Sequence, residues 1–153
     1  MFAWRRLRQT FAGRWTRQAV VEFHTAEKYL LLAHGTVAYR ELGRLVAAIS
    51  GLPRKEFAAA YQDACMAAMC MLATPAKHTN VLQHMAGFFK DRLESTDRSE
   101  LADLIHDYRN GLVPLIMPLT LIRHHVRRLG VDYLQGQRYL QPHPKELMLR
   151  NHV

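Results

Sequence analysis

The stretch KHTNVLQHMAGFFK, Lys77–Lys90, decides the fold because it sets polar residues at regular spacing inside an apolar pattern. Successive residues of an α-helix turn by about 100°, so the sequence can be sorted by face. One face is an apolar stripe made of Val81, Leu82, Met85 and Phe89. A polar strip lies beside it and holds Lys77, Asn80, His84, Gly87 and Asp91. The stretch therefore predicts an amphipathic helix with a single polar flank.

The polar strip has two interpretations. It is either a hydrogen-bonded seam between two helices or a groove that faces a ligand. Gly87 bears on both, because glycine inside a helix costs about 1 kcal/mol relative to alanine. That cost indicates that a neighbouring helix or a ligand approaches the backbone closely at Gly87.

The helical pattern continues in both directions from this stretch. Proline, glycine, serine and threonine separate the segments, and Thr74-Pro75 has the form of an N-cap followed by proline at the first helical position. About six helices are expected, over residues 17–34, 36–50, 54–73, 75–93, 100–111 and 119–130. No segment alternates as a strand does, and no repeat is visible. The prediction is an all-α, single-domain bundle with a C-terminal tail packed on its surface.

The charge of the chain favours a polyanionic partner. The 153 residues carry 21 Lys and Arg against 13 Asp and Glu, a net charge of +8. Nucleic acid and an anionic membrane surface are the two polyanions that such a surplus suits. No apolar run reaches the roughly 18 residues of a spanning helix, so no transmembrane segment is expected.

The last expected helix carries the clearest basic face. Its apolar stripe consists of Leu119, Ile122, Val126 and Leu129. The opposite side consists of Thr120, Arg123, His124, Arg127 and Arg128. No acid occurs between Asp107 and Asp132, so nothing nearby in the sequence neutralises this face. A helix of this kind is suited to a phosphate backbone.

The sequence contains no recognisable catalytic or metal-binding motif. Nine histidines are present, but none forms HExxH or a ligand cluster, and no Cys-x-x-Cys pair occurs. Cys65 and Cys70 would face different directions on a helix, which indicates free thiols and a reducing, cytoplasmic location. No GxSxG, Walker-type loop or GxGxxG is found. We therefore expect no enzymatic activity, no metal and no cofactor.

Several blocks, in order, resemble one bacterial family. They are FHTAEKYLLLAH, YRELGRLVA, TPAKHTNVLQHMAGFFK, ELADLIHDYRNGLVPLIMPLTLIRHH and YLQPHPKELMLRN. Together they resemble the YbgA-like domain over residues 21–153, which leaves residues 1–20 as a basic N-terminal arm or linker. The family occurs alone or fused behind a cysteine-rich desulfidase domain, where the resemblance implies that it holds tRNA containing 4-thiouridine. With two cysteines, this sequence is not expected to contain the desulfidase domain.

The expected function is that of a non-catalytic RNA-binding module, for tRNA above all. It would assist thionucleoside desulfuration by a partner domain, a desulfidase or another tRNA-modifying enzyme. The predicted RNA-binding residues are Lys28, Arg44, Lys77, Asn80, His84, Lys90, Arg109, Arg123, His124, Arg127 and Arg128. Two alternatives stay open: a small enzyme or metal-dependent protein that uses Lys77, Asn80 and His84, and a protein-interaction module.

Overall fold

The computed structural model describes residues 2–142, and this part of the chain is helical without any β-strand. The predicted all-α fold is confirmed. The chain groups into two compact units, unit 1 (Met1–Leu72) and unit 2 (Ala73–Val153), which are described separately below. Within the described residues, no helix is both long and apolar enough to cross a membrane.

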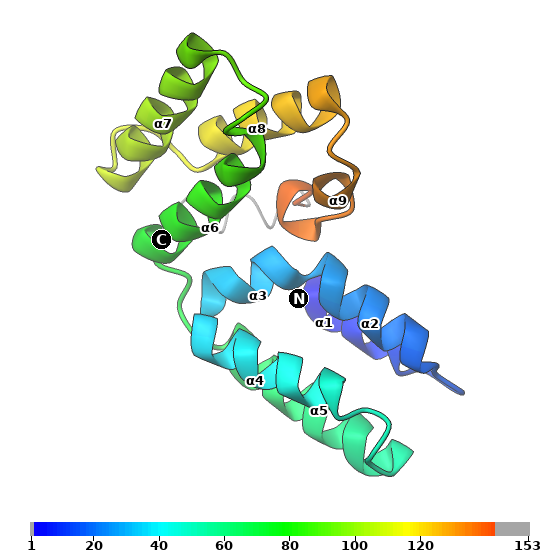
Figure 1. Ribbon diagram of the computed structural model, residues 1–153. Coiled ribbons are helices and arrows are strands. Elements are labelled where there is room, and N and C mark those ends of the chain that lie inside the picture. Colours follow the sequence, from blue (N-terminus) through cyan, green and yellow to red (C-terminus); the bar gives the residue numbers. More distant parts are fainter. Residues whose placement is uncertain (1, 143–153) are drawn as a thin grey trace. The chain divides into compact units, whose positions relative to one another are not determined.

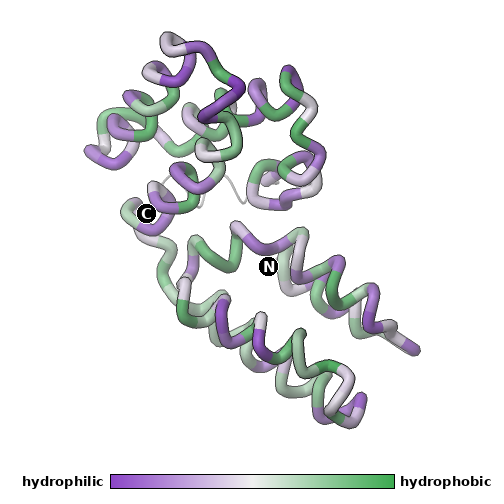
Figure 2. Tube along the Cα trace, viewed as in Figure 1, coloured by the Kyte–Doolittle hydropathy of each residue, from purple (hydrophilic) through white to green (hydrophobic). Residues whose placement is uncertain are grey.

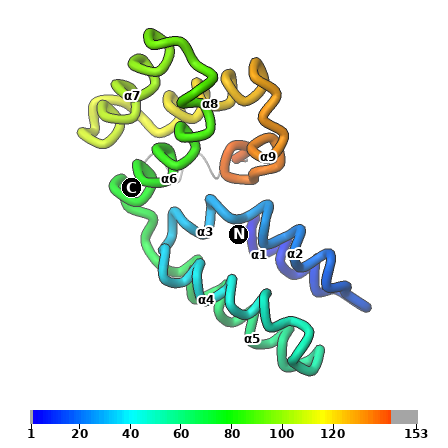
Figure 3. The backbone as a smooth tube through the Cα atoms, viewed as in Figure 1, coloured from blue at the N-terminus to red at the C-terminus, as the bar shows by residue number. Residues whose placement is uncertain are grey.

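The described part of unit 1 forms five helices (Figure 1). They are α1 (Phe2–Thr10), α2 (Arg17–Ala26), α3 (Lys28–His34), α4 (Thr36–Ala47) and α5 (Arg54–Met69). The backbone trace shows α4 and α5 running side by side as a helical hairpin (Figure 3). Leu42, Phe57 and Tyr61 are fully buried in the core that these helices share with α2.

The expected helix over residues 17–34 is interrupted at Glu27, where φ is −90° and ψ is 0°. Glu27 is only 1 % exposed, and its carboxylate accepts hydrogen bonds from the Arg6 guanidinium at 2.5 and 3.0 Å. A buried carboxylate is tolerated when it is paired and hydrogen-bonded in this way. The helical period predicts continuous helix here because it contains no information about a partner 21 residues away.

The segment expected to be an N-terminal arm is an integral part of unit 1 from residue 2 onward. Ala3 and Leu7 of α1 are buried, and Phe11 and Trp15 pack against the core cluster. Ala3 and Leu7 are four residues apart and so lie on one side of α1, whereas Phe11 and Trp15 follow the end of that helix. These contacts make the apolar side chains of this segment part of the packed interior of unit 1.

Unit 2 contains the remaining described helices (Figure 1). They are α6 (Pro75–Ala86), the 3-10 turn η1 (Gly87–Phe89), α7 (Ser95–Arg109), α8 (Ile116–Leu129), the short α9 (Asp132–Gln135) and the 3-10 turn η2 (Arg138–Leu140). Hydrophilic and hydrophobic residues alternate along the turns of these helices, as expected when each has one buried side (Figure 2). The predicted C-terminal tail falls largely after residue 142, outside the described residues.

Local signals explain where the helices of unit 2 begin and end. The Thr74 hydroxyl accepts a hydrogen bond from the Lys77 amide at 3.4 Å, and Pro75 is the first helical residue, as predicted. Gly130 ends α8 in the left-handed conformation, with φ of +60°. Residues 95–99, expected to be a polar link, instead form the first turn of α7.

Candidate nucleic-acid interface

Helix α8 presents the basic face that its sequence predicts. Leu119, Ile122 and Val126 are buried, whereas Thr120, His124, Arg127 and Arg128 are exposed and Arg123 is half-buried. The buried side packs on α6 and α7, because its apolar residues recur at spacings of three and four. The basic side is left at the surface of unit 2.

One carboxylate reaches this face from another helix. Asp97 of α7 forms an ion pair with Arg128, and the hydrogen bond from that guanidinium holds the pKa of Asp97 below its usual range. The expectation that no acid neutralises the face is therefore wrong at Arg128. Sequence reasoning missed Asp97 because it lies 31 residues away and becomes a neighbour only when α7 packs against α8.

Arg123 and Arg127 remain the available cations of α8. Neither has an ion-pair partner within residues 2–142. They line a hollow of about 280 Å³ whose other walls come from α9 and the η2 region. Its lining is Arg123, Val126, Arg127, Leu134, Gln135, Leu140 and Gln141. The two guanidinium groups thus stand beside a recess with both apolar and amide surfaces.

The polar strip of α6 faces outward. Asn80 and His84 are exposed, Lys77 is half-buried, and the neighbouring apolar stripe is fully buried, as predicted. A Cβ added at Gly87 would meet no heavy atom within 4 Å outside its own helix. Within residues 2–142, no neighbouring helix therefore approaches the Gly87 backbone, which does not support a seam between helices there. The alternative of a ligand-facing groove stays a prediction.

A groove of about 380 Å³ lies between α6 and α7. Its lining is Thr79, Gln83, Ala86, Gly87, Lys90, Leu93, Arg98, Leu101, Ala102, Ile105, His106 and Arg109. Lys90 and Arg109 were predicted as binding residues and do line it, but Lys77, Asn80 and His84 do not. The α6 residues that line the groove each precede a residue of the predicted strip by one position. The groove therefore runs along the side of α6 next to that strip.

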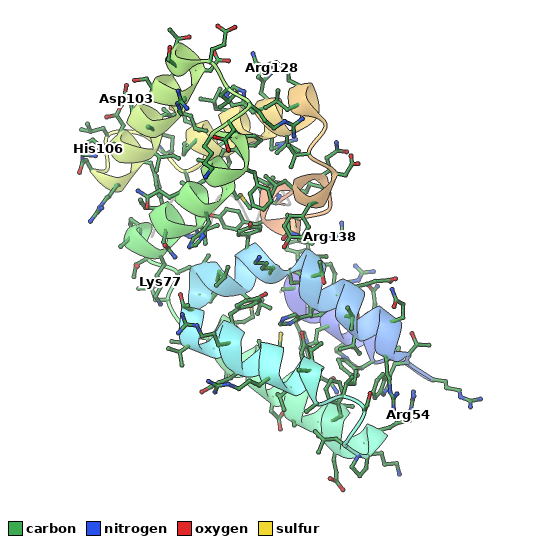
Figure 4. All side chains as sticks on the ribbon, in the orientation of Figure 1. Arg54, Lys77, Asp103, His106, Arg128 and Arg138 are labelled. Carbon is green, nitrogen blue, oxygen red and sulfur yellow. The ribbon has the colours of Figure 1, made fainter. Side chains whose placement is uncertain are left out.

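Arg98 and His106 of this groove were missed from the sequence. His106 is labelled on α7 in Figure 4, and the Arg98 guanidinium donates to the Lys90 carbonyl at 2.7 Å. Positions 98, 102, 105, 106 and 109 recur at helical spacing on α7, so a wheel of that helix would have grouped them. A helical wheel of α7 does not show which other helix packs against these positions.

Lys28 and Arg44 belong to unit 1. The Lys28 ammonium lies 5.2 Å from the centroid of the Tyr29 ring, and Arg44 is exposed in the last turn of α4. The predicted binding set is thus divided between the two units, with its other members on α6, α7, α8 and the turn that follows η1.

Two buried histidines, His24 and His78, each pair with a tyrosine. His24 Nδ1 lies 3.0 Å from the Tyr61 hydroxyl, and His78 Nδ1 lies 2.7 Å from the Tyr139 hydroxyl. Burial lowers the pKa of His24, which keeps its imidazole neutral near pH 7. Within residues 2–142, no three His, Cys, Asp or Glu side chains come together as metal ligands would.

Cys65 lies in the same interior as the His24–Tyr61 pair. Burial raises the pKa of its thiol to about 12, so the thiol is protonated near neutral pH. A protonated, buried thiol is a small apolar side chain and a poor nucleophile. Both cysteines are free, as expected.

Comparison with known proteins identifies the family. The model of the family described as "Protein of unknown function (DUF1722)" matches residues 28–144. "Uncharacterized protein YbgA" of Escherichia coli (strain K12) is 36% identical over 137 residues, which cover 89% of this chain and 81% of that protein. No solved structure matches the chain. The resemblance seen in the sequence is confirmed, and the chain belongs to the YbgA-like family.

Proposed function

We propose that the chain is a non-catalytic RNA-binding module whose contact surface in unit 2 is the outer face of α8. The observation that supports this most is the placement of Arg123 and Arg127 beside one hollow, without an ion-pair partner among the described residues. Arginine fits this role because its planar guanidinium donates two parallel hydrogen bonds to a phosphate.

The hollow beside these arginines suits the sugar and base edges of RNA. Val126, Leu134 and Leu140 provide buried apolar surface, and Gln135 and Gln141 contribute amides. Amide groups can donate and accept hydrogen bonds at once, which base edges and 2′-hydroxyls require. Phosphate contacts would orient the RNA, and the recess would receive part of a nucleotide.

The α6–α7 groove is a second basic surface of unit 2. Lys90, Arg98 and Arg109 line it, and its remaining lining includes no carboxylate. Leu93, Leu101 and Ile105 form an apolar floor of the kind on which an unstacked base can lie. The proposal assigns these cations to RNA phosphates as well.

The RNA we propose is tRNA, and the partner is an enzyme that removes sulfur from a thionucleoside such as 4-thiouridine. This finer assignment is supported by membership of the YbgA-like family and by the fusions that the family forms with desulfidase domains. In this scheme the chain holds the RNA, and the sulfur chemistry belongs to the partner.

The decisive measurement is the affinity for total tRNA as a function of salt concentration. Each phosphate neutralised by a cation contributes roughly 0.7 to 0.9 to the slope of log K against log salt. The double variant Arg123→Ala/Arg127→Ala should therefore lose about 1.4 to 1.8 of that slope. The matched control Arg5→Ala/Arg40→Ala removes the same charge from exposed positions on α1 and α4 and should change little. Salt-insensitive binding, or an equal loss in both double variants, would rule out this interface.

A further inference from the structure

We infer that unit 1 contains a phosphate-binding site in a hollow of about 370 Å³ beside the start of α2. The hollow is lined by Arg14, Trp15, Thr16, Arg17, Ile49, Leu52 and Arg54. Three of these seven residues are arginines, and none is acidic. This site is separate from the surfaces of unit 2 and does not depend on RNA binding there.

Arg54 is held in place before any ligand arrives. Its guanidinium donates a hydrogen bond to the Trp15 carbonyl and lies 4.2 Å from the centroid of the indole ring. Figure 4 labels Arg54 at the start of α5. A cation stacked on tryptophan is restricted in motion while its other N–H groups stay available. Binding an anion therefore costs Arg54 little additional ordering.

Trp15, on which the Arg54 guanidinium stacks, is itself held by aromatic contacts. The Trp15 ring lies 5.3 Å from that of Phe11 and 5.5 Å from that of Phe57, which is fully buried. Gly13 allows the chain to turn before Trp15, since its φ of +61° lies in the left-handed region. The turn directs the chain from α1 into α2, and Arg14 and Arg17 line the hollow from this connection and the start of α2.

Arg14 and Arg17 provide the unpaired charge. Both are exposed, and neither has an ion-pair partner within residues 2–142. Thr16 caps α2 by accepting from the Ala19 amide at 3.1 Å, and the hollow is lined by Thr16 and Arg17 at this end of the helix, where the first backbone amides have no partner within the helix. These amides reinforce the preference for an anion that the three guanidinium groups create.

The chemistry of the hollow identifies the class of ligand. Three guanidinium groups around one recess repel one another until an anion enters, and a phosphate dianion offers enough oxygens for all three. A carboxylate has only two oxygens and one charge. The ligand is therefore a phosphate group, supplied either by inorganic phosphate or by a nucleoside monophosphate.

Trp15 is the reporter for the test. The chain has two tryptophans, and Trp4→Phe at the exposed position leaves Trp15 as the only indole. Indole fluorescence of the full-length Trp4→Phe protein is followed during titration with inorganic phosphate and, separately, with adenosine 5′-monophosphate. Potassium chloride at matched ionic strength serves as the blank. A saturable change with either phosphate compound, absent with chloride, is the expected result.

The two titrations distinguish the source of the phosphate. Equal affinities mean that the phosphate group alone is recognised, and tighter binding of the nucleotide means that a nucleoside is recognised with it. Adding Arg14→Gln/Arg17→Gln should weaken binding at least about tenfold, since charge-assisted hydrogen bonds are lost. The matched control, Arg5→Gln/Arg40→Gln, should retain it. No saturable change with either compound, or equal weakening in both double variants, overturns the site.

Discussion

The two units place their charges differently. Unit 1 buries the Glu27 carboxylate and pairs it with the half-buried Arg6. The described part of unit 2 buries no ion pair, and its one ion pair, Arg128 with Asp97, lies near the surface. Each unit nevertheless buries one histidine–tyrosine pair. Unit 1 therefore holds a charged side chain in its interior, whereas the described part of unit 2 buries no Lys, Arg, Asp or Glu.

Breaking the Arg6–Glu27 ion pair is the strongest way to test this contrast. Arg6→Ala leaves the Glu27 carboxylate buried without its cation, and we expect the free energy of unfolding to fall by about 3 kcal/mol. Urea unfolding measures this loss. Arg5→Ala, the exposed neighbour, should change stability by less than about 0.5 kcal/mol. Similar losses in the two variants would mean that the Arg6–Glu27 pair contributes nothing specific.

The histidine–tyrosine pairs test what the units have in common. Tyr61→Phe and Tyr139→Phe each remove one hydroxyl from a buried hydrogen bond and leave a histidine nitrogen without that partner. Each should lower the free energy of unfolding by about 1 to 2 kcal/mol. Thermal unfolding of the two variants is the measurement. A loss in one unit and none in the other would show that the pairs are not equivalent.

His125 in α8 differs from the paired histidines, because it is buried without a hydrogen-bond partner among the described residues. Both of its ring nitrogens lack such a partner. His125→Leu removes these unsatisfied groups, so we expect a gain in stability of about 1 kcal/mol at pH 7.

The lowered pKa of His125 predicts that the free energy of unfolding depends on pH. Burial, with the Arg128 charge nearby, lowers the pKa of His125 below 6.5. As pH falls below 6.5, the unfolded chain takes up a proton first, so the native protein loses stability. His125→Leu should remove part of this acid-side loss in urea unfolding at pH 7 and pH 5. An unchanged pH dependence would show that His125 is not the group responsible.

The smallest expected effect concerns Asp97. Asp97→Asn removes the carboxylate that occupies Arg128 and frees this guanidinium for RNA. At most one further phosphate would be contacted, so the salt slope should steepen by about 0.7 to 0.9. Measuring tRNA affinity at two salt concentrations is sufficient. An unchanged slope would indicate that Arg128 does not contact the RNA.

Much of α8 and α6 could be predicted because one helix contains its own geometry. The exposed positions of α8, the buried stripe of α6 and the Thr74 cap all follow from local spacing and local hydrogen bonding. The YbgA-like family was also evident from blocks of the sequence in order. These features need no knowledge of what lies opposite each helix.

The remainder required contacts between distant residues. Local spacing predicts that Glu27 continues a helix, but Glu27 pairs with Arg6, which is 21 residues away. Local spacing also predicts an α8 face without acid, but Asp97 of α7 pairs with Arg128. The groove of unit 2 has the same origin, since Arg98 and His106 reach it only because α7 packs along α6.

The sequence of this protein by itself determined an all-α fold, the inward and outward faces of its helices and an excess of positive charge. Those properties depend on residue spacing within one helix and on composition. Tertiary structure decided which charges are neutralised and which remain available, because an ion pair is set by the distance between side chains in space. It likewise showed that Gly87 opens onto a groove, and that three arginines of unit 1 share one hollow.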